Sequence, residues 1–338
     1  MSFVCLFSFN DKQMLKNLSI IFFYYFTQTT AIFMLDTFLS SSKLLKTFQG
    51  HTDWVWSIDY LTSDIDEFIC SGSHDKTVRV WDVNENKQIR SFNGHSDNVY
   101  HAKFSPYHYY NNHRSVICSS SRDKTIRFWD IKDNLQLQVF NGHTDGICGI
   151  TFSSFNGGRY LFSGSWDKTI HLWDVETSKA LHIFNGHKAV IWCVDISPLQ
   201  GNNHNRNDNN GKSNSAGVIG GNGYTICSGS FDKTIRIWDI ETNKQLIVFD
   251  KHSDWIRSVK YGSNELENIG ACAILSGSSD KSIRLWIFGL KELHIIKGNK
   301  EHGGILCLKF LQSKKDKKRN SDINLCYGSV SGSICVWG

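Results

Sequence analysis

Short stretches in which apolar and polar residues alternate recur along most of the chain. Val55–Tyr60 alternates, Phe68–Ser73 is an apolar run closed by small residues, and Thr77–Val83 alternates again. A period of two is typical of a β-strand, whereas a helix would repeat its apolar residues every 3.6 positions. Gly72–Lys76 has the composition of a turn, and Lys87–Phe92 supplies a fourth stretch. The pattern therefore predicts four consecutive short strands, which we name a, b, c and d.

This four-strand unit is repeated along the chain. A histidine, usually preceded by glycine, precedes strand a at His51, His95, His143, His187, His252 and His302. A tryptophan lies on strand c at Trp81, Trp129, Trp173, Trp238, Trp286 and Trp337. Successive tryptophans are 44 to 65 residues apart, so six units cover residues 43 to 338. A period of this length with four strands per repeat is typical of β-propeller blades.

Five stretches around strands b and c are nearly identical. They are SGSHDKTVRVWD (71–82), SSSRDKTIRFWD (119–130), SGSWDKTIHLWD (163–174), SGSFDKTIRIWD (228–239) and SGSSDKSIRLW (276–286). With the upstream Gly-His pairs, the chain closely resembles the WD-repeat family over almost nine-tenths of its length. The resemblance implies an all-β fold, a WD-type β-propeller of four-stranded antiparallel blades that serves as a rigid binding platform. It does not by itself identify a partner, because one fold hosts many functions.

A histidine, a serine, an aspartate and a tryptophan recur in each of the first five units. In WD-repeat proteins the equivalent residues form one buried hydrogen-bonded chain per blade, and the resemblance implies the same structural network here. The matching sets are His51-Ser71-Asp75-Trp81, His95-Ser119-Asp123-Trp129, His143-Ser163-Asp167-Trp173, His187-Ser228-Asp232-Trp238 and His252-Ser276-Asp280-Trp286. A fully satisfied buried network of this kind fixes the turn and the strand register together.

The sixth unit departs from this pattern. His302 and Trp337 are kept, but Tyr327 stands at the serine position and Ser331 at the aspartate position. Its hydrogen-bonded chain is therefore expected to be incomplete, and we expect this blade to be the least stable.

A strand ahead of the first unit provides a way to close the ring. Lys43–Phe48 resembles strand d, and the sequence stops at Gly338, directly after the sixth strand c. Pairing of Lys43–Phe48 with the last blade would remove the open interface between the first and last blades. We therefore expect residues 43–338 to form a six-bladed propeller closed by this N-terminal strand.

Residues 1–42 form a hydrophobic N-terminal extension that allows three interpretations. Leu18–Leu35 carries no charge over 18 residues, close to the roughly 20 that a membrane helix needs, so a membrane or signal segment is one of them. In the second, Phe3–Phe9, Leu18–Phe26 and Ala31–Asp36 are degenerate strands that make a seventh blade. In the third, the extension is unstructured. The sequence leaves all three open.

Charge and composition outside the repeats add little. The net charge is +5, and Lys314–Arg319 carries most of it, so the rest of the chain gives no sign of a nucleic-acid partner. We interpret Lys314–Arg319 as a solvated loop, with a nuclear-import or phosphate-binding patch as the alternative. Gly201–Gly223, rich in asparagine, glycine and serine, predicts a disordered loop between strands a and b of the fourth unit.

Cysteine usage indicates a reducing compartment. The ten cysteines include no C-x-x-C pair, and most recur at matching points of the repeat. They are therefore interpreted as small core residues, which places the protein in the cytoplasm, with the nucleus as the alternative.

The sequence favours a protein without enzymatic activity. Serine, histidine and aspartate also make up a hydrolase triad, but five copies at one spacing indicate a scaffold rather than a single reactive nucleophile. No G-x-S-x-G, P-loop or H-E-x-x-H motif is present. The repeat histidines lie in separate units, so no metal site and no cofactor are predicted.

Aromatic residues outside strand c gather at three positions of the repeat. These positions lie three and five residues after the repeat histidine and directly before the turn aspartate. In WD-repeat proteins they surround the central opening of the propeller, on the face that carries the d-to-a and b-to-c loops. The predicted partner-binding residues are Trp54, Trp56, His74, Tyr100, Arg122, Trp166, Trp192, Phe231, Trp255 and Arg257.

These residue types suggest how the protein acts. Tryptophan, tyrosine and arginine most often dominate the energy of protein interfaces, so we predict a protein-interaction scaffold that works within a multiprotein complex. The alternative for any single residue is packing between blades. Two alternatives for the whole protein are a propeller tethered to a membrane through Leu18–Leu35 and a nuclear assembly factor in a nucleic-acid-linked complex.

Overall fold

The computed structural model is described here for nine parts of the chain. They are residues 2–3, 46–62, 67–197, 224–262, 273–287, 292–297, 304–312, 323–330 and 334–337. Three predictions lie outside these ranges: the interpretation of most of residues 1–42, the disordered loop at 201–223 and the basic stretch at 314–319.

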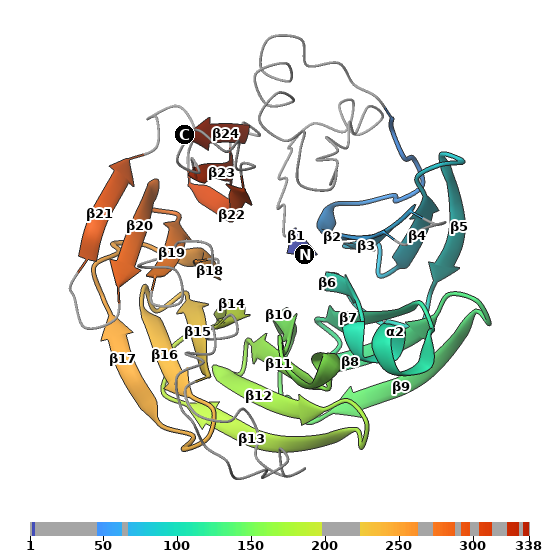
Figure 1. The fold of residues 1–338 in the computed structure, drawn as a ribbon, viewed down its shortest axis with the longest axis horizontal. Helices are drawn as coiled ribbons and strands as arrows, with labels where there is room; N and C mark the ends of the chain where they lie inside the picture. The colour runs from blue at the N-terminus through green and yellow to red at the C-terminus, as the bar shows by residue number, and fades with distance from the viewer. Residues whose placement is uncertain are drawn as a thin grey trace, which may run out of the picture.

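The described residues form six antiparallel sheets arranged in order around a common centre (Figure 1). In each sheet the strands follow one another in sequence order from the centre outward. Strands β2, β6, β10, β14, β18 and β22 are innermost among the repeat strands, and β5, β9, β13, β17 and β21 form the outer rim. The predicted all-β fold of four-stranded antiparallel units is therefore confirmed; the number of blades and the closure of the ring remain predictions.

The first three sheets contain the N-terminal half of the repeats. The first sheet consists of β1 (Ser2–Phe3), β2 (Val55–Thr62), β3 (Glu67–Ser73), β4 (Val78–Asp82) and β5 (Lys87–Phe92). The second consists of β6 (Val99–Phe104), β7 (Val116–Ser121), β8 (Thr125–Asp130) and β9 (Leu135–Asn141). The third consists of β10 (Ile147–Phe152), β11 (Tyr160–Ser165), β12 (Thr169–Asp174) and β13 (Lys179–Asn185).

The remaining three sheets follow in the same way. The fourth consists of β14 (Ile191–Ile196), β15 (Thr225–Ser230), β16 (Ile235–Asp239) and β17 (Gln245–Phe249). The fifth consists of β18 (Ile256–Tyr261), β19 (Ala273–Ser278), β20 (Ser282–Ile287) and β21 (Glu292–Lys297). The sixth consists of β22 (Ile305–Gln312), β23 (Ile323–Ser329) and β24 (Ile334–Trp337). Two short helices, α2 (Pro106–Asn112) and η2 (Asn156–Gly158), lie in loops between inner and second strands.

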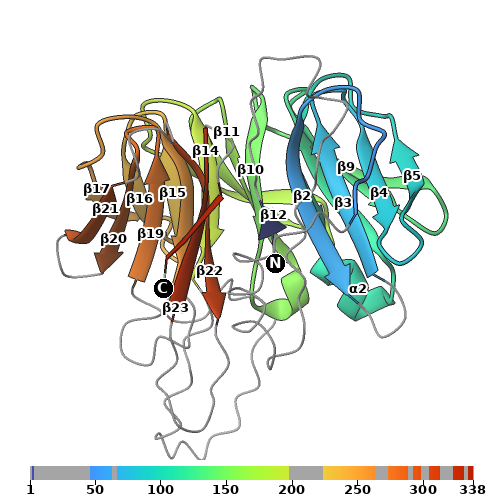
Figure 2. The same cartoon turned by 90° about the horizontal axis from the view of Figure 1, so that it is seen from above.

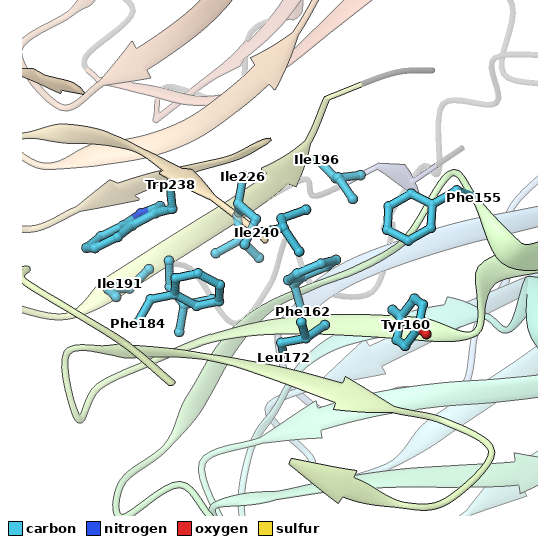
Figure 3. Close-up of a cluster of buried hydrophobic side chains, with 12 residues drawn as sticks. Phe155, Tyr160, Phe162, Leu172, Phe184, Ile191, Ile196, Ile226, Trp238 and Ile240 are labelled. Carbon is cyan, nitrogen blue, oxygen red and sulfur yellow. The ribbon is translucent and has the colours of Figure 1, made fainter. Parts of the chain in front are cut away.

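The hydrophobic cores lie between neighbouring sheets. One cluster joins Phe162 and Phe184 of the third sheet to Ile191, Ile226 and Trp238 of the fourth (Figure 3). Similar clusters of buried side chains join each other pair of consecutive sheets from the first to the sixth. The second to fifth sheets are thus apolar on both faces, and neighbouring sheets stabilise one another by removing this surface from water.

The predicted closing strand is seen only in part. Residues 46–48 lie outside any strand, and residues 43–45 are outside the described ranges. Phe48 nevertheless packs on Trp81, with ring centroids 5.6 Å apart, as Phe92 packs on Trp129 at 5.2 Å. Phe48 therefore occupies the position that a strand d residue holds at the other interfaces, but no pairing with β24 is observed for the described residues.

The two ends of the chain show two further features. β1 pairs antiparallel with β2, at the inner edge of the first sheet. Tyr327, which replaces the repeat serine in the sixth unit, is 2% exposed and packs with Leu275 of the fifth sheet and Ile305 of the sixth. A large apolar side chain thus fills the place of the small hydroxyl, which is consistent with a modified core in this unit.

No helix within the described ranges is long and apolar enough to cross a membrane. Leu18–Leu35 lies outside those ranges, so its prediction as a membrane or signal segment is left as it stands. Six cysteines within these ranges are free thiols, at Cys70, Cys118, Cys148, Cys193, Cys227 and Cys307.

Candidate protein-binding face

The four recurring residues of the first unit are joined by short hydrogen bonds. The indole Nε1 of Trp81 donates to Ser71 Oγ at 2.9 Å, and Ser71 Oγ lies 2.7 Å from His51 Nε2. His51 Nδ1 lies 2.8 Å from Asp75 Oδ2. An ionised carboxylate only accepts hydrogen bonds, so the imidazole proton lies on Nδ1 and the Ser71 hydroxyl donates to Nε2.

The same chain is formed in the next four units, with each bond between 2.7 and 2.9 Å. The residues brought together are His95-Ser119-Asp123-Trp129, His143-Ser163-Asp167-Trp173, His187-Ser228-Asp232-Trp238 and His252-Ser276-Asp280-Trp286. Gly94 shows why glycine precedes the histidine: a Cβ there would come within 2.6 Å of Trp129 Cη2. The chain therefore links the d-to-a loop, strand b and strand c in one blade.

The aspartate of each chain also shapes the b-to-c turn. Asp75 Oδ1 accepts the Thr77 backbone N–H at 3.0 Å, and Oδ2 accepts the Thr52 backbone N–H at 3.0 Å. Between them Lys76 has a φ of 69°, a left-handed conformation that costs a non-glycine residue about 1 kcal/mol or more. Lysine has the same conformation in the four equivalent turns, at Lys124, Lys168, Lys233 and Lys281. The carboxylate thus stabilises a turn that the lysine alone would disfavour.

The environment of these chains fixes their charge state. Burial lowers the pKa of His51, His95 and His187 by more than the hydrogen bond to the aspartate raises it. Burial acts to raise the pKa of Asp75, but the hydrogen bond and charge of His51 outweigh it, so this pKa lies well below its usual range. At neutral pH these three histidines are therefore uncharged, and Asp75 is ionised.

Mild acid should therefore destabilise the fold. Burial lowers the pKa of His171 to about 4 and that of His108 to about 4, whereas an unfolded histidine has a pKa of about 6.5. The unfolded chain thus binds these protons more tightly than the folded chain. The stability that the two uncharged histidines contribute is complete above pH 6.5 and is lost as the pH falls toward 4. We expect the midpoint of urea unfolding to be lower at pH 5.5 than at pH 7.5.

The variant His171→Arg is a control for this prediction. The other four complete units carry arginine at this position, at Arg79, Arg127, Arg236 and Arg284. Because the substitution removes one of the titrating groups, the loss of stability between pH 7.5 and pH 5.5 should be smaller. Equal midpoints for the unmodified chain at both pH values would contradict the prediction.

A β-bulge on each inner strand directs one side chain toward the centre. On β2, Val55 pairs with Ser73 and Ser57 with Gly72, so Trp56 is left without a partner in the ladder. Bulges re-aim the extra side chain. The same register shift occurs on the other five inner strands, at Tyr100, Cys148, Trp192, Arg257 and Leu306. Four of these six positions belong to the predicted partner-binding set.

The aromatic residues of the first two sheets form one half of a continuous cluster. The ring centroids of Trp54 and Trp56 are 5.7 Å apart, and His74 lies 5.5 Å from Trp54 and 6.1 Å from Trp56. Tyr100 lies 5.6 Å from Trp56. Trp56 also reaches Trp192 of the fourth sheet at 6.2 Å, so the cluster spans the central opening.

The other half of the cluster is a stack of three aromatic rings and an arginine. Phe231 is stacked between Trp192, at 5.3 Å, and Trp255, at 4.4 Å. The Arg257 guanidinium lies over all three rings, at 4.9 to 5.3 Å from their centroids, and its Nε donates to Ser279 Oγ at 3.2 Å. Cation–π contacts and stacking of this kind hold side chains in one orientation.

Arg122 and Trp166 form a further pair on the same face. The Arg122 guanidinium lies 5.6 Å from the Trp166 ring centroid, and Arg122 is exposed. Trp166 packs against the central cluster, so the pair is continuous with it. The structure therefore brings all ten predicted residues to one surface, which we name the aromatic face.

Burial divides the aromatic face into a floor and an accessible part. Tyr100 is 7% exposed and Trp192 is 8% exposed, so these two support the cluster and are not free to contact a partner. Trp255 is 42% exposed. The other accessible or half-buried members are Trp54, Trp56, His74, Arg122, Trp166, Phe231 and Arg257.

Sequence reasoning missed part of this region. Cys148 and Leu306 hold bulge positions and complete the floor of the cluster. Charged residues also lie three positions beyond the bulge residue on five inner strands, at Asp59, Lys103, Asp195, Lys260 and Lys309. The signal was present, because a charge at the same point of an otherwise apolar strand recurs from unit to unit.

One group of side chains has the composition of a metal site. Possible ligand atoms of His143, Asp167 and His171 lie within 4.8 Å of one another. Both nitrogens of His143 already bond Asp167 and Ser163, and the His143 and His171 rings are stacked at 3.7 Å. The nitrogen lone pairs of two stacked rings lie in parallel planes, so they do not point at one common ion. The arrangement therefore fits ring packing better than shared metal coordination.

Comparison with known proteins identifies the class that this fold and these repeats define. The family model described as "WD domain, G-beta repeat" matches residues 42–82, 86–130, 134–174, 215–239 and 243–286, more than half of the chain. The chain therefore belongs to the WD-repeat family.

Three curated proteins illustrate how far the similarity to particular members extends. The peroxisomal targeting signal 2 receptor of Mus musculus is 33% identical over 63 residues, which is 19% of this chain and 20% of that protein. WD repeat protein iqw1 of Schizosaccharomyces pombe is 40% identical over 74 residues, 21% of this chain and 9% of that protein. The guanine nucleotide-binding protein subunit beta of Zea mays is 41% identical over 58 residues, 17% and 15% respectively. The matches thus span a fifth or less of each relative.

Proposed function

We propose that this protein is a non-enzymatic scaffold that binds peptide segments or domains of partner proteins on its aromatic face. Membership of the WD-repeat family supports a protein-interaction role in general. The observation that carries the more specific proposal is the Phe231–Trp255–Arg257 stack, which presents a large aromatic side chain to solvent in a fixed orientation. Such residues bind with little loss of conformational entropy.

The burial of the repeat serines supports the absence of enzymatic activity. The serine is the nucleophile of a hydrolase triad, and each repeat serine is no more than 1% exposed. Each hydroxyl is also already engaged by an indole and an imidazole, so it serves the fold. The five repeat serines are Ser71, Ser119, Ser163, Ser228 and Ser276.

The accessible residues define the chemistry of the partner. Aromatic rings supply apolar contact, while Arg122 is exposed and able to pair with a carboxylate of the partner. We therefore expect a partner segment with an apolar anchor and an acidic neighbour. We place the complex in the cytoplasm, where free thiols such as those of the described cysteines persist.

Simultaneous replacement of Trp166 and Trp255 by alanine should remove partner capture. Loss of two interface tryptophans typically costs 2 kcal/mol or more, about a 30-fold fall in affinity. The measurement is affinity purification with quantitative mass spectrometry, followed by titration of the captured partner.

A matched control uses an aromatic residue far from this surface. Tyr110 is 67% exposed on α2, which follows the end of β6 that lies away from Tyr100. Figure 2 shows α2 at the lower edge of the sheets. Tyr110→Ala should bind like the unmodified chain. If the double tryptophan variant folded normally and captured the same partners in the same amounts, the aromatic face would not be the binding surface.

A further inference from the structure

A small cavity lies beneath the aromatic face, inside the ring of inner strands. Tyr100, Trp192 and Arg257 line its upper part, and His101, Lys103 and Lys260 line the rest. Its volume is about 40 Å³, room for a few water-sized atoms and too small for a nucleotide or a sugar phosphate.

The walls of this cavity are positively charged. Three cationic side chains, Lys103, Lys260 and Arg257, line it, and no carboxylate does. Lys260 is partly neutralised, because its Nζ lies 3.1 Å from Asp195 Oδ1, behind the lining. Arg257 is engaged with the aromatic stack above. Lys103 has no comparable partner.

Two buried hydrogen-bond donors in the cavity wall are unsatisfied. Lys103 is 6% exposed, and its Nζ forms no hydrogen bond or ion pair with any described residue. His101 is 4% exposed; its Nδ1 accepts the Ile150 backbone N–H at 3.2 Å, and its Nε2 has no partner among the described residues. Because Nδ1 accepts, Nε2 of the neutral ring carries the proton and is a donor. Both side chains therefore lack an acceptor.

The inner strands set the charges around Lys103. Asp59 on β2 and Asp195 on β14 each use one oxygen to accept a backbone N–H of the next inner strand, from Phe104 at 2.9 Å and from Tyr261 at 3.0 Å. The other oxygen of Asp195 bonds Lys260, whereas Oδ1 of Asp59 has no hydrogen-bond partner among the described residues, and the charge of Asp59 acts on Lys103 without a direct bond. On the other side of β6, β10 carries Thr151 at the equivalent position, so it offers no carboxylate to Lys103.

We propose that this cavity binds a small anion, of the size of chloride, formate or bicarbonate, held by Lys103 Nζ and His101 Nε2. Lys260 and Arg257 add positive potential without direct contact being required. An ammonium group in an apolar interior is costly unless it is hydrogen-bonded and its charge is compensated, and an anion supplies both. Burial, and next the charge of Lys260, lower the pKa of Lys103 to about 8, against the opposing charges of Asp59 and Asp195. Lys103 thus remains mainly protonated at neutral pH.

The test is the thermal unfolding of the full-length chain in sodium chloride and in sodium formate, with sodium gluconate keeping the ionic strength constant. Gluconate is too large for the cavity. For the unmodified chain we expect a saturable rise of about 1–3 °C in the unfolding temperature at tenfold the dissociation constant. Lys103→Met should abolish this rise, whereas Lys179→Met, at an exposed lysine on β13, should leave it unchanged.

Two outcomes would overturn the proposal. One is an equal rise in Lys103→Met and in the unmodified chain; the other is no difference between chloride and gluconate, which would mean that water alone fills the cavity. If Lys103→Met does not fold, the chloride-35 NMR linewidth is measured in the presence of the unmodified chain instead. A line that the protein broadens, and that formate narrows again by competition, supports the site. The lack of such broadening refutes it.

Discussion

Replacing Ser119 by alanine should lower the free energy of unfolding by about 2–4 kcal/mol. Ser119 Oγ accepts the Trp129 indole N–H at 2.8 Å and lies 2.7 Å from His95 Nε2, and the serine is fully buried. Alanine would leave both partners buried without a hydrogen bond, at about 1–3 kcal/mol each. The measurement is the midpoint of urea unfolding at pH 7.5, with tryptophan fluorescence as the signal.

The neighbouring residue on the same strand provides the matched control. Ser120 is also fully buried on β7, but its Oγ has no hydrogen-bond partner among the described residues. Four other units carry glycine at this position, at Gly72, Gly164, Gly229 and Gly277. Removing an unpaired hydroxyl exposes no partner, so Ser120→Ala should leave stability unchanged or slightly raised. If both alanine variants lost the same stability, the hydrogen-bonded chain would not be the source of the effect.

The elements of the fold could be predicted closely because the repeat supplies both the pattern and its limits. The four stretches predicted in the first unit appear as β2 to β5, and their ends differ from the prediction by at most two residues. Alternation indicated which residues are strands, and the aspartate turn indicated where strand b ends and strand c begins. Lys43–Phe48 borders no such turn, and its described residues, 46 to 48, are not in a strand.

The sequence predicted which residues make up the aromatic face, but not which of them are buried beneath it. The positions of Trp54 and Trp255 relative to the repeat histidine placed them near the central opening. The burial of Tyr100 and Trp192 depends on bulges that turn side chains from several blades toward one another. A bulge adds one residue to a strand without changing its apolar pattern, so alternation alone does not reveal it.

The two kinds of tryptophan in this chain should respond oppositely to substitution. Trp238 is 2% exposed and lies between the third and fourth sheets, packed near Phe184 and Ile226 (Figure 3). Its indole also donates to Ser228 Oγ at 2.9 Å. Trp238→Ala should lower the free energy of unfolding by about 3–5 kcal/mol, because it leaves a cavity between two blades and an unpaired buried group. Urea unfolding measures this loss.

Trp255→Ala is the matched comparison, since the same side chain is removed from an exposed position. Trp255 contacts Phe231 and Arg257 on one side only, so its removal should cost about 1 kcal/mol of stability. Partner affinity should respond in the reverse order: Trp255→Ala weakens binding while the protein stays folded, and Trp238→Ala, at temperatures where it remains folded, binds normally. If Trp255→Ala destabilised the chain as much as Trp238→Ala, the outer stack would belong to the core, and the aromatic face would lose its most accessible anchor.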